Sequence, residues 1–153
     1  MANTQAMCTS FKVDLLNAVH AFNATGIPAH TAATADTFKA ALYVTTATVN
    51  ATTTAYNATN EVSGIGYTAG GVTVTMGTAP SSTSTTAFIT PSASIVYTTV
   101  TLSTSFDAVL IYNSTQSNKA VSVHTFTAQT VAAGTFTLTM PTNDATTGLI
   151  RLA

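Results

Sequence analysis

Thr135-Phe-Thr-Leu-Thr-Met140 is the stretch of this sequence that indicates its fold most clearly. Apolar residues alternate with threonines, which is the period of a strand with one buried face and one solvated face. Val72-Thr-Val-Thr-Met76, which follows Gly70-Gly71, has the same alternation. Threonine and valine also favour extended backbone because their β-carbons are branched. These stretches predict strands whose outer face is lined by neutral hydroxyl groups.

Other runs continue the β pattern along the chain. Residues 36–44 place Phe38, Ala40 and Leu42 on one face of a strand and Lys39 and Tyr43 on the other. Residues 109–112 (Val-Leu-Ile-Tyr) are apolar on both faces, which predicts a central strand that is covered on each side. Further β-branched runs lie at residues 95–102 and 120–126, and a final short strand is expected at residues 149–152.

One segment has the pattern of a helix. Phe11, Leu15, Val19 and Phe22 recur at spacings of four, four and three, which predicts one apolar stripe over residues 11–22, within a helical segment 9–24. Ser10 is the expected cap, and Asp14 is expected near the first turn. A helix of about three turns is not stable alone, so it must pack on the sheet.

The sequence therefore predicts a mainly β protein, an antiparallel sandwich or barrel-like domain with one N-terminal amphipathic helix. No shift in composition marks a boundary, so residues 1–153 are expected to form a single domain. Two segments lack a clear period. Thr45–Thr59 fits an extended edge arm that orders on contact, or a weakly ordered loop, and residues 79–86 fit a flexible loop tip.

Charge is unusually scarce in this chain. Four lysines and arginines and five acidic residues make 6% of the 153 residues, and the formal net charge is −1. An ordinary soluble domain has roughly 25% charged residues. A neutral surface rich in threonine can pack against neighbours without the cost of burying charges. This composition favours a protein made for assembly, with a homo-oligomer, and specifically a trimer, as the expected form.

Candidate sites for metal chemistry are weak. His20, His30 and His124 belong to no HExxH or paired-cysteine pattern, so we expect no metal site.

Candidate sites for catalysis are equally weak. The carboxylates are scattered, each with a structural role available, so we expect no catalytic pair; they are Asp14, Asp36, Glu61, Asp107 and Asp144. Cys8 is expected to be a free structural thiol. Gly64-Ile-Gly66 and Gly70-Gly71 lack the lysine and the following helix of a phosphate loop, so a turn and a bulge are expected there, with no cofactor.

Other function classes are also disfavoured. Four basic residues cannot form a patch that tracks phosphates, so nucleic acid is not an expected partner. The sequence contains no stretch of about 18 apolar residues, so we expect no membrane-spanning helix. The N-terminus has no signal-peptide pattern. Pairs of the form Thr-x-Thr occur without a fixed period, which argues against an ice-binding solenoid.

Several segments resemble small virion proteins of tailed bacteriophages. They are residues 36–43 (Asp-Thr-Phe-Lys-Ala-Ala-Leu-Tyr), residues 51–71, residues 107–113 (Asp-Ala-Val-Leu-Ile-Tyr-Asn) and residues 143–153, together with the predicted helix. The resemblance spans most of the chain and implies a structural component of the virion. It carries no active-site residue.

Within a virion, we expect a capsid decoration (cement) protein that bridges neighbouring capsid subunits. Its expected partners are itself, as a homotrimer, and the major capsid protein or another virion protein. A tail, baseplate or fibre component is the alternative, as an attachment or receptor-binding module. A secreted adhesin or carbohydrate-binding module is disfavoured by the absence of tryptophan and of a signal peptide.

Overall fold

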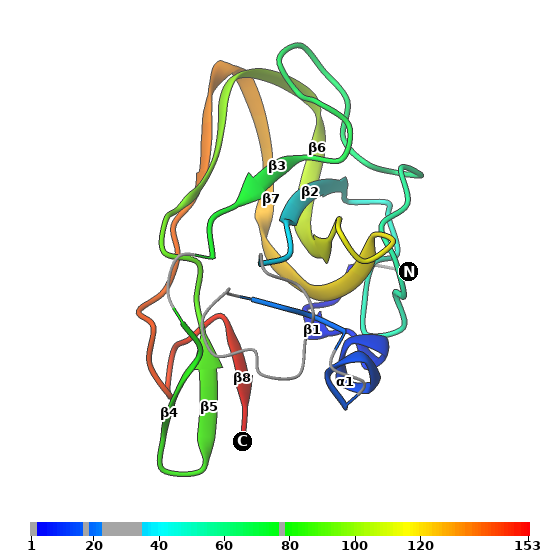
Figure 1. Cartoon of the computed structure of the whole chain (residues 1–153). Helices are drawn as coiled ribbons and strands as arrows, with labels where there is room; N and C mark the ends of the chain where they lie inside the picture. The colour runs from blue at the N-terminus through cyan, green and yellow to red at the C-terminus, as the bar shows by residue number, and fades with distance from the viewer. Residues whose placement is uncertain (1–2, 17–18, 23–34, 77–78) are drawn as a thin grey trace.

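The computed structural model describes residues 3–16, 19–22, 35–76 and 79–153. The protein is mainly β and sandwich-like, with two antiparallel sheets and one short helix, as the sequence predicts (Figure 1). The larger sheet has the order β1-β7-β6-β2-β3, and the smaller has the order β4-β5-β8. The bounds of the elements are β1 Ala6–Met7, α1 Thr9–Leu16, β2 Phe38–Val44, β3 Val72–Val74, β4 Ser81–Thr83, β5 Thr86–Ile89, β6 Ile95–Asn113, β7 Lys119–Leu138 and β8 Ile150–Leu152.

The predicted central strand is confirmed. Residues 109–112 lie in β6, between β2 and β7, and all four are at most 2% exposed. Side chains at these positions meet packed layers on both faces, which is why the run has no polar alternation. One cluster of buried residues extends from Cys8 to Ile150 and includes residues of both sheets.

The β6–β7 hairpin is much longer than the short strands that the sequence predicts. Four predicted strands merge into this ribbon of 19 and 20 residues, which arches over the top of the molecule (Figure 1). The pairing register shifts between Tyr97 and Val100, between Val100 and Leu102, and between Leu102 and Phe106. Such bulges bend a ribbon and increase its twist, so the two strands turn without a break. Asp107 consequently lies inside β6 and not before a strand.

The predicted helix over residues 11–22 is too long. The helix begins at Thr9 and ends at Leu16, so Ser10 lies inside it, and Asp14 lies beyond its first turn. Residues 19–22 are not helical, because the Ala21 N–H donates to the Asp36 carboxylate (2.9 Å) and the Ala21 carbonyl accepts from the Asp36 N–H (2.9 Å). Residues 17–18 and the rest of the predicted segment, 23–24, lie outside the described residues.

The aromatic end of the predicted stripe still reaches the core. Phe22 stacks on Phe38 of β2 with ring centroids 4.7 Å apart and meets Phe11 of α1 edge-on at 6.0 Å. The apolar periodicity therefore predicted correctly that Phe22 packs against the core, but it did not predict the length of the helix.

Both segments without a clear period are built into the fold. The Thr45–Thr59 segment packs on the body of the single chain, which corrects the expectation of an arm that orders only on contact. The Thr45 N–H donates a hydrogen bond to the Ser105 carbonyl (3.1 Å), and the Tyr56 N–H donates one to the Asn118 carbonyl (2.9 Å). Residues 79–86 are not a simple loop tip, since most of them form the β4–β5 hairpin, in which Ser81 pairs with Phe88.

Candidate functional site

A network of tyrosine hydroxyls converges on Glu61, in the long connection between β2 and β3. The Glu61 carboxylate accepts hydrogen bonds from Tyr56 (2.6 Å), from Tyr67 (2.7 Å) and from the Gly70 N–H (2.8 Å). The Tyr67 hydroxyl in turn accepts from the Leu42 N–H of β2 (3.0 Å). This chain of bonds joins the connection to the middle of the larger sheet.

The remaining tyrosines hold the same connection and sheet together. Their hydroxyls all donate to backbone carbonyls: Tyr43 to Asn57 (2.6 Å), Tyr97 to Ala40 (2.8 Å) and Tyr112 to Gly70 (2.8 Å). All five tyrosines of the chain thus have a bonded hydroxyl.

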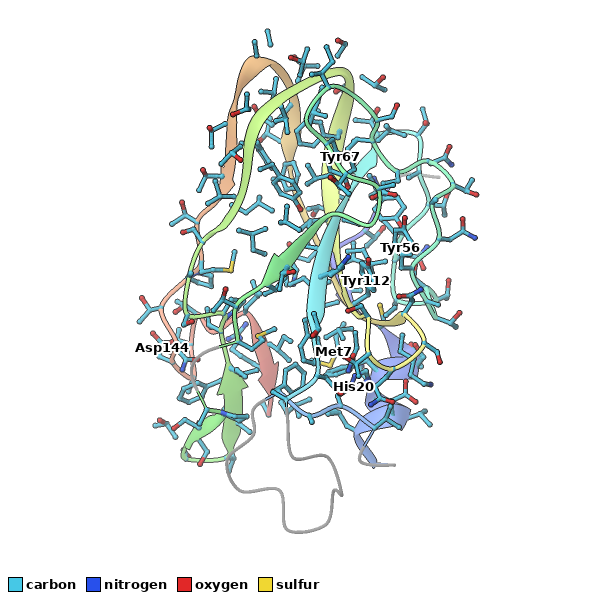
Figure 2. All side chains as sticks on the ribbon, turned by 45° about the horizontal axis from the view of Figure 1, so that its top comes forward. Met7, His20, Tyr56, Tyr67, Tyr112 and Asp144 are labelled. Atoms are coloured by element: carbon cyan, nitrogen blue, oxygen red, sulfur yellow. The ribbon has the colours of Figure 1, made fainter. Side chains whose placement is uncertain are left out.

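Ring stacking reinforces these bonds. The rings of Tyr56 and Tyr112, which lie near each other in Figure 2, stack with centroids 4.7 Å apart, and those of Tyr67 and Tyr97 stack at 5.9 Å. The packed rings restrict the orientation of the hydroxyls that donate to Glu61 and Gly70.

The electrostatics of the network disfavour acid–base chemistry. Burial raises the pKa of each tyrosine hydroxyl, and the Glu61 carboxylate raises the pKa of Tyr56 and Tyr67 further. The hydroxyls therefore stay protonated and donate to fixed acceptors at neutral pH. The five tyrosines and Glu61 thus form a hydrogen-bonded network, which we call the tyrosine clamp, that holds the connection between β2 and β3 against the larger sheet. The sequence analysis did not predict this network. Its one visible signal is that Tyr56 and Tyr67 flank the single glutamate of the chain.

A second polar cluster joins the helix to the start of β2 and the β6–β7 turn. Asp14 accepts from the Lys119 ammonium at 2.8 and 3.1 Å, and the Asp14 carboxylate lies 3.7 Å from His20 Nε2. Burial lowers the pKa of His20, and the nearby carboxylates of Asp14 and Asp36 only partly oppose this shift. The His20 side chain is fully buried. A neutral imidazole here serves packing and hydrogen bonding.

Asp36 ties this cluster to the sheet. Its carboxylate accepts from the Asn113 amide (2.7 Å), from the Gln116 amide (3.1 Å) and from the Ala21 N–H. Burial alone would raise the pKa of Asp36, but these hydrogen bonds together lower it. Asp36 lies just before β2, in the structural role that the sequence predicts for it.

The other sequence candidates lie apart from one another. Cys8 is fully buried, and burial raises the pKa of its thiol to about 11, so it is not a thiolate at neutral pH. His124 lies in β7 as predicted, whereas His30 is outside the described residues. Asp144 accepts from the Thr146 and Thr147 N–H groups at 2.7 Å, within a turn.

The glycines mark close backbone approaches. Gly66 and Gly71 have positive φ angles of 78° and 70°, and Gly71 closes a turn through its bond to the Thr68 carbonyl (3.0 Å). A turn is the predicted role of Gly70-Gly71. Among the described residues, no three His, Cys, Asp or Glu side chains gather as a metal site would require.

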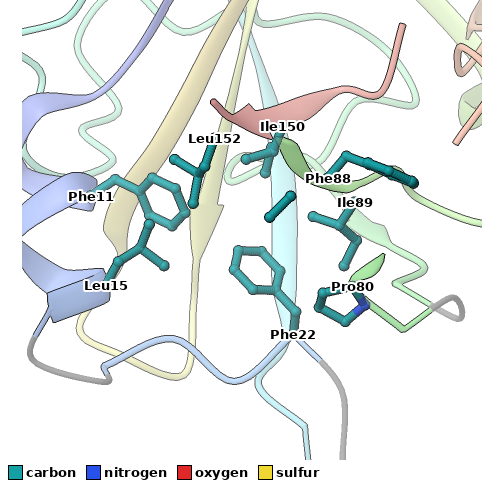
Figure 3. Close-up of a pocket in the computed structure, with 9 residues that line it drawn as sticks. Phe11, Leu15, Phe22, Pro80, Phe88, Ile89, Ile150 and Leu152 are labelled. Atoms are coloured by element: carbon teal, nitrogen blue, oxygen red, sulfur yellow. The ribbon is translucent and has the colours of Figure 1, made fainter. Parts of the chain in front are cut away.

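An apolar groove of about 160 Å³ lies between α1 and the smaller sheet (Figure 3). It is lined by Phe11, Leu15, Phe22, Pro80, Ala87, Phe88, Ile89, Ile150 and Leu152. No titratable or nucleophilic side chain is among them. The groove can accept an apolar group but has no polar group to orient a substrate.

Lowering the pH is expected to destabilise the protein through His124. Burial lowers the pKa of His124 to about 4, below its ordinary value of 6.5, and its Nε2 lies 2.9 Å from the Ser122 hydroxyl. The unfolded chain therefore binds a proton that the folded chain does not, so stability is full above pH 6.5 and is lost progressively down to about 4. The free energy of unfolding, measured with urea, should fall between about pH 7 and about pH 4.5 in both proteins. We expect the fall to be about 2 kcal/mol larger in the unsubstituted protein than in His124→Gln, which lacks the titrating imidazole. Equal losses in the two proteins would contradict this expectation.

Comparisons with known proteins return nothing for this chain. No family model matches it, and neither a curated protein nor a solved structure matches it significantly. The structure shows a mainly β, sandwich-like domain in which the Glu61 and Asp36 carboxylates accept hydrogen bonds from neighbouring segments. No helix among the described residues is long and apolar enough to span a membrane.

Proposed function

We propose that this chain is a structural protein of a tailed-bacteriophage virion, and that it decorates and cements the capsid shell. The observation that carries this proposal is the neutral character of its exposed β surface. Residues 127–130 of β7 (Thr-Ala-Gln-Thr) are all exposed, and residues 120–143 contain no lysine, arginine, aspartate or glutamate. Such a surface can be buried between capsid subunits at little desolvation cost. The resemblance of several segments to small phage virion proteins supports the same role.

The mechanism of a cement protein is mass action. A copy that binds only the closed, expanded shell stabilises that state by RT ln(1 + [L]/Kd), so affinity and concentration set the gain. In this proposal the chain acts as a homotrimer that bridges neighbouring copies of the major capsid protein. The role requires a rigid domain and no catalysis, which fits the use of five tyrosines and a glutamate as a clamp.

The second candidate is a tail, baseplate or fibre component. The observation that favours it is the β4–β5 hairpin, which lies at one end of the molecule (Figure 1) and whose residues 81–85 are all exposed. Exposed loops on a rigid frame commonly carry recognition in attachment modules.

Copy number in the purified virion separates these roles. Quantitative mass spectrometry against the major capsid protein is expected to find this chain in hundreds of copies, which is the order of magnitude of lattice sites on a shell. A few to a few tens of copies would favour the tail or fibres. Complete absence from virions would overturn the virion proposal and return attention to an adhesin.

A further inference from the structure

The outer edge of β7 is paired only at its start. There, β1 pairs with Ser122 and Val123, and Ala55 forms a bridge with Lys119. From residue 125 to residue 138, no strand and no backbone hydrogen bond from the described parts of the chain reaches this edge. An open edge presents unpaired N–H and C=O groups to any other strand.

The arch of the ribbon is protected by its bulges. Between the pairs Ala108–Thr125 and Phe106–Gln129, β7 has two residues more than β6, and Ala133 adopts a positive φ of 55°. These irregularities twist the backbone, so an added strand cannot follow the edge through residues 126–133. Bulges of this kind are one of the devices by which proteins block edge pairing.

Residues 135–138, which we name the β7 limb, have no such protection. The pairs Ile95–Leu138, Val96–Thr137 and Tyr97–Phe136 are in unbroken register. Thr135 and Thr137 are exposed, while Phe136 and Leu138 are half-buried. The limb is thus a regular strand with one inward face and one open edge.

Charge and proline are also absent from the limb. The nearest charged residues along the chain are Lys119 and Asp144, and the nearest proline after the limb is Pro141. Two identical limbs can therefore meet without like charges opposing each other, and the limb carries no charge that would select a different partner. Val96, which is 38% exposed and lies opposite Thr137, adds an apolar side chain on the same outer face.

We propose that the β7 limb is a self-association surface, where the backbone pairs with a strand of a second copy of this chain. This inference deepens the proposed assembly role, because it names the surface through which the copies join. The pairing converts an unprotected edge into a continuous sheet.

The test compares two lysine substitutions. Thr137→Lys places a charge on the limb, and Thr104→Lys places the same charge on an exposed threonine of β6 away from the open edge. The molar mass of the purified protein is measured by light scattering over a wide concentration range, and hydrogen exchange is measured for residues 135–138. Circular dichroism and urea unfolding establish that both variants are folded.

The unsubstituted protein and Thr104→Lys are expected to form the same oligomer, with protected amides in the limb. Thr137→Lys should weaken association by about tenfold or more and lose that protection, because charged side chains would oppose each other across the pair. A monomeric unsubstituted protein would overturn the proposal, as would a folded Thr137→Lys that still assembles with protected limb amides. These outcomes are independent of copy number in virions, so either proposal can fail while the other stands.

Discussion

Replacing Gly71 with alanine is expected to lower the free energy of unfolding by at least about 3 kcal/mol. Gly71 has φ +70°, which costs an alanine roughly 1–2 kcal/mol. A β-carbon at this position would also collide with the backbone carbonyl of Ala40 in β2. Because Ala40 is fully buried, β2 cannot move aside without disturbing its pairing with β6. Urea unfolding followed by circular dichroism measures the change.

Gly134→Ala is the matched control for this prediction. Gly134 lies in β7 without a positive φ, and the nearest atom to an added β-carbon is a Val131 methyl group at 3.6 Å, an ordinary contact. We expect this substitution to leave stability within about 0.5 kcal/mol or to raise it slightly, since alanine restricts the unfolded chain. Similar losses for the two alanines would show that the close approach of Gly71 to β2 does not determine stability.

Replacing Glu61 with alanine is expected to cost about 3 kcal/mol. The change removes the acceptor of three hydrogen bonds, from Tyr56, Tyr67 and the Gly70 N–H. Hydrogen bonds to a charged group contribute about 1.5–3 kcal/mol each, and the sum is smaller here because Glu61 is only partly buried. Without the Glu61 carboxylate, the connection between β2 and β3 should become more mobile. Hydrogen exchange at the Gly70 amide should therefore be faster in the variant than in the original protein.

Glu61→Gln tests the cause of that loss. Glutamine keeps the shape and one acceptor oxygen, so it should cost less than half as much as alanine does. Tyr56→Phe, which removes one of the three donors, should fall near the glutamine variant, at about 1–2 kcal/mol. If Glu61→Ala proved as stable as the original protein, the tyrosine network would contribute only packing and no hydrogen-bond energy.

Both predictions concern the same structural feature. The connection of residues 45–71 has little regular structure, yet Gly71 and Glu61 hold it against β2. A rigid surface on a domain with few charges suits the proposed repeated binding to a lattice, because less conformational entropy is lost in each contact. The stability experiments therefore bear on the proposed assembly role as well as on folding.

Local pattern predicted the strands reliably where burial has a simple period. The double-sided apolar run of residues 109–112 lies in β6, and the alternation of residues 135–140 lies in β7 as far as Leu138, where that strand ends. The scarcity of charge likewise predicted a neutral surface directly from composition. These features depend on one residue and its near neighbours, so a single sequence contains them.

Features that join distant residues could not be predicted in this way. The helix ends early because Ala21 pairs with Asp36, and the sequence contains no signal for that contact across a long intervening segment. The merging of four predicted strands into one arched ribbon depends on bulges, which change the direction of a strand without changing its composition.

By itself, the sequence determined the fold class, the central strand and the neutral surface, because each follows from the local alternation of apolar and polar side chains. Only the tertiary structure decided that five tyrosines and Glu61 form a clamp, that the Thr45–Thr59 segment packs on the sheet, and that residues 135–138 leave an open edge. These features arise from contacts and from missing contacts between residues far apart in the chain. Whether such residues meet depends on their positions in the folded chain, and the local periodicity of the sequence does not specify those positions.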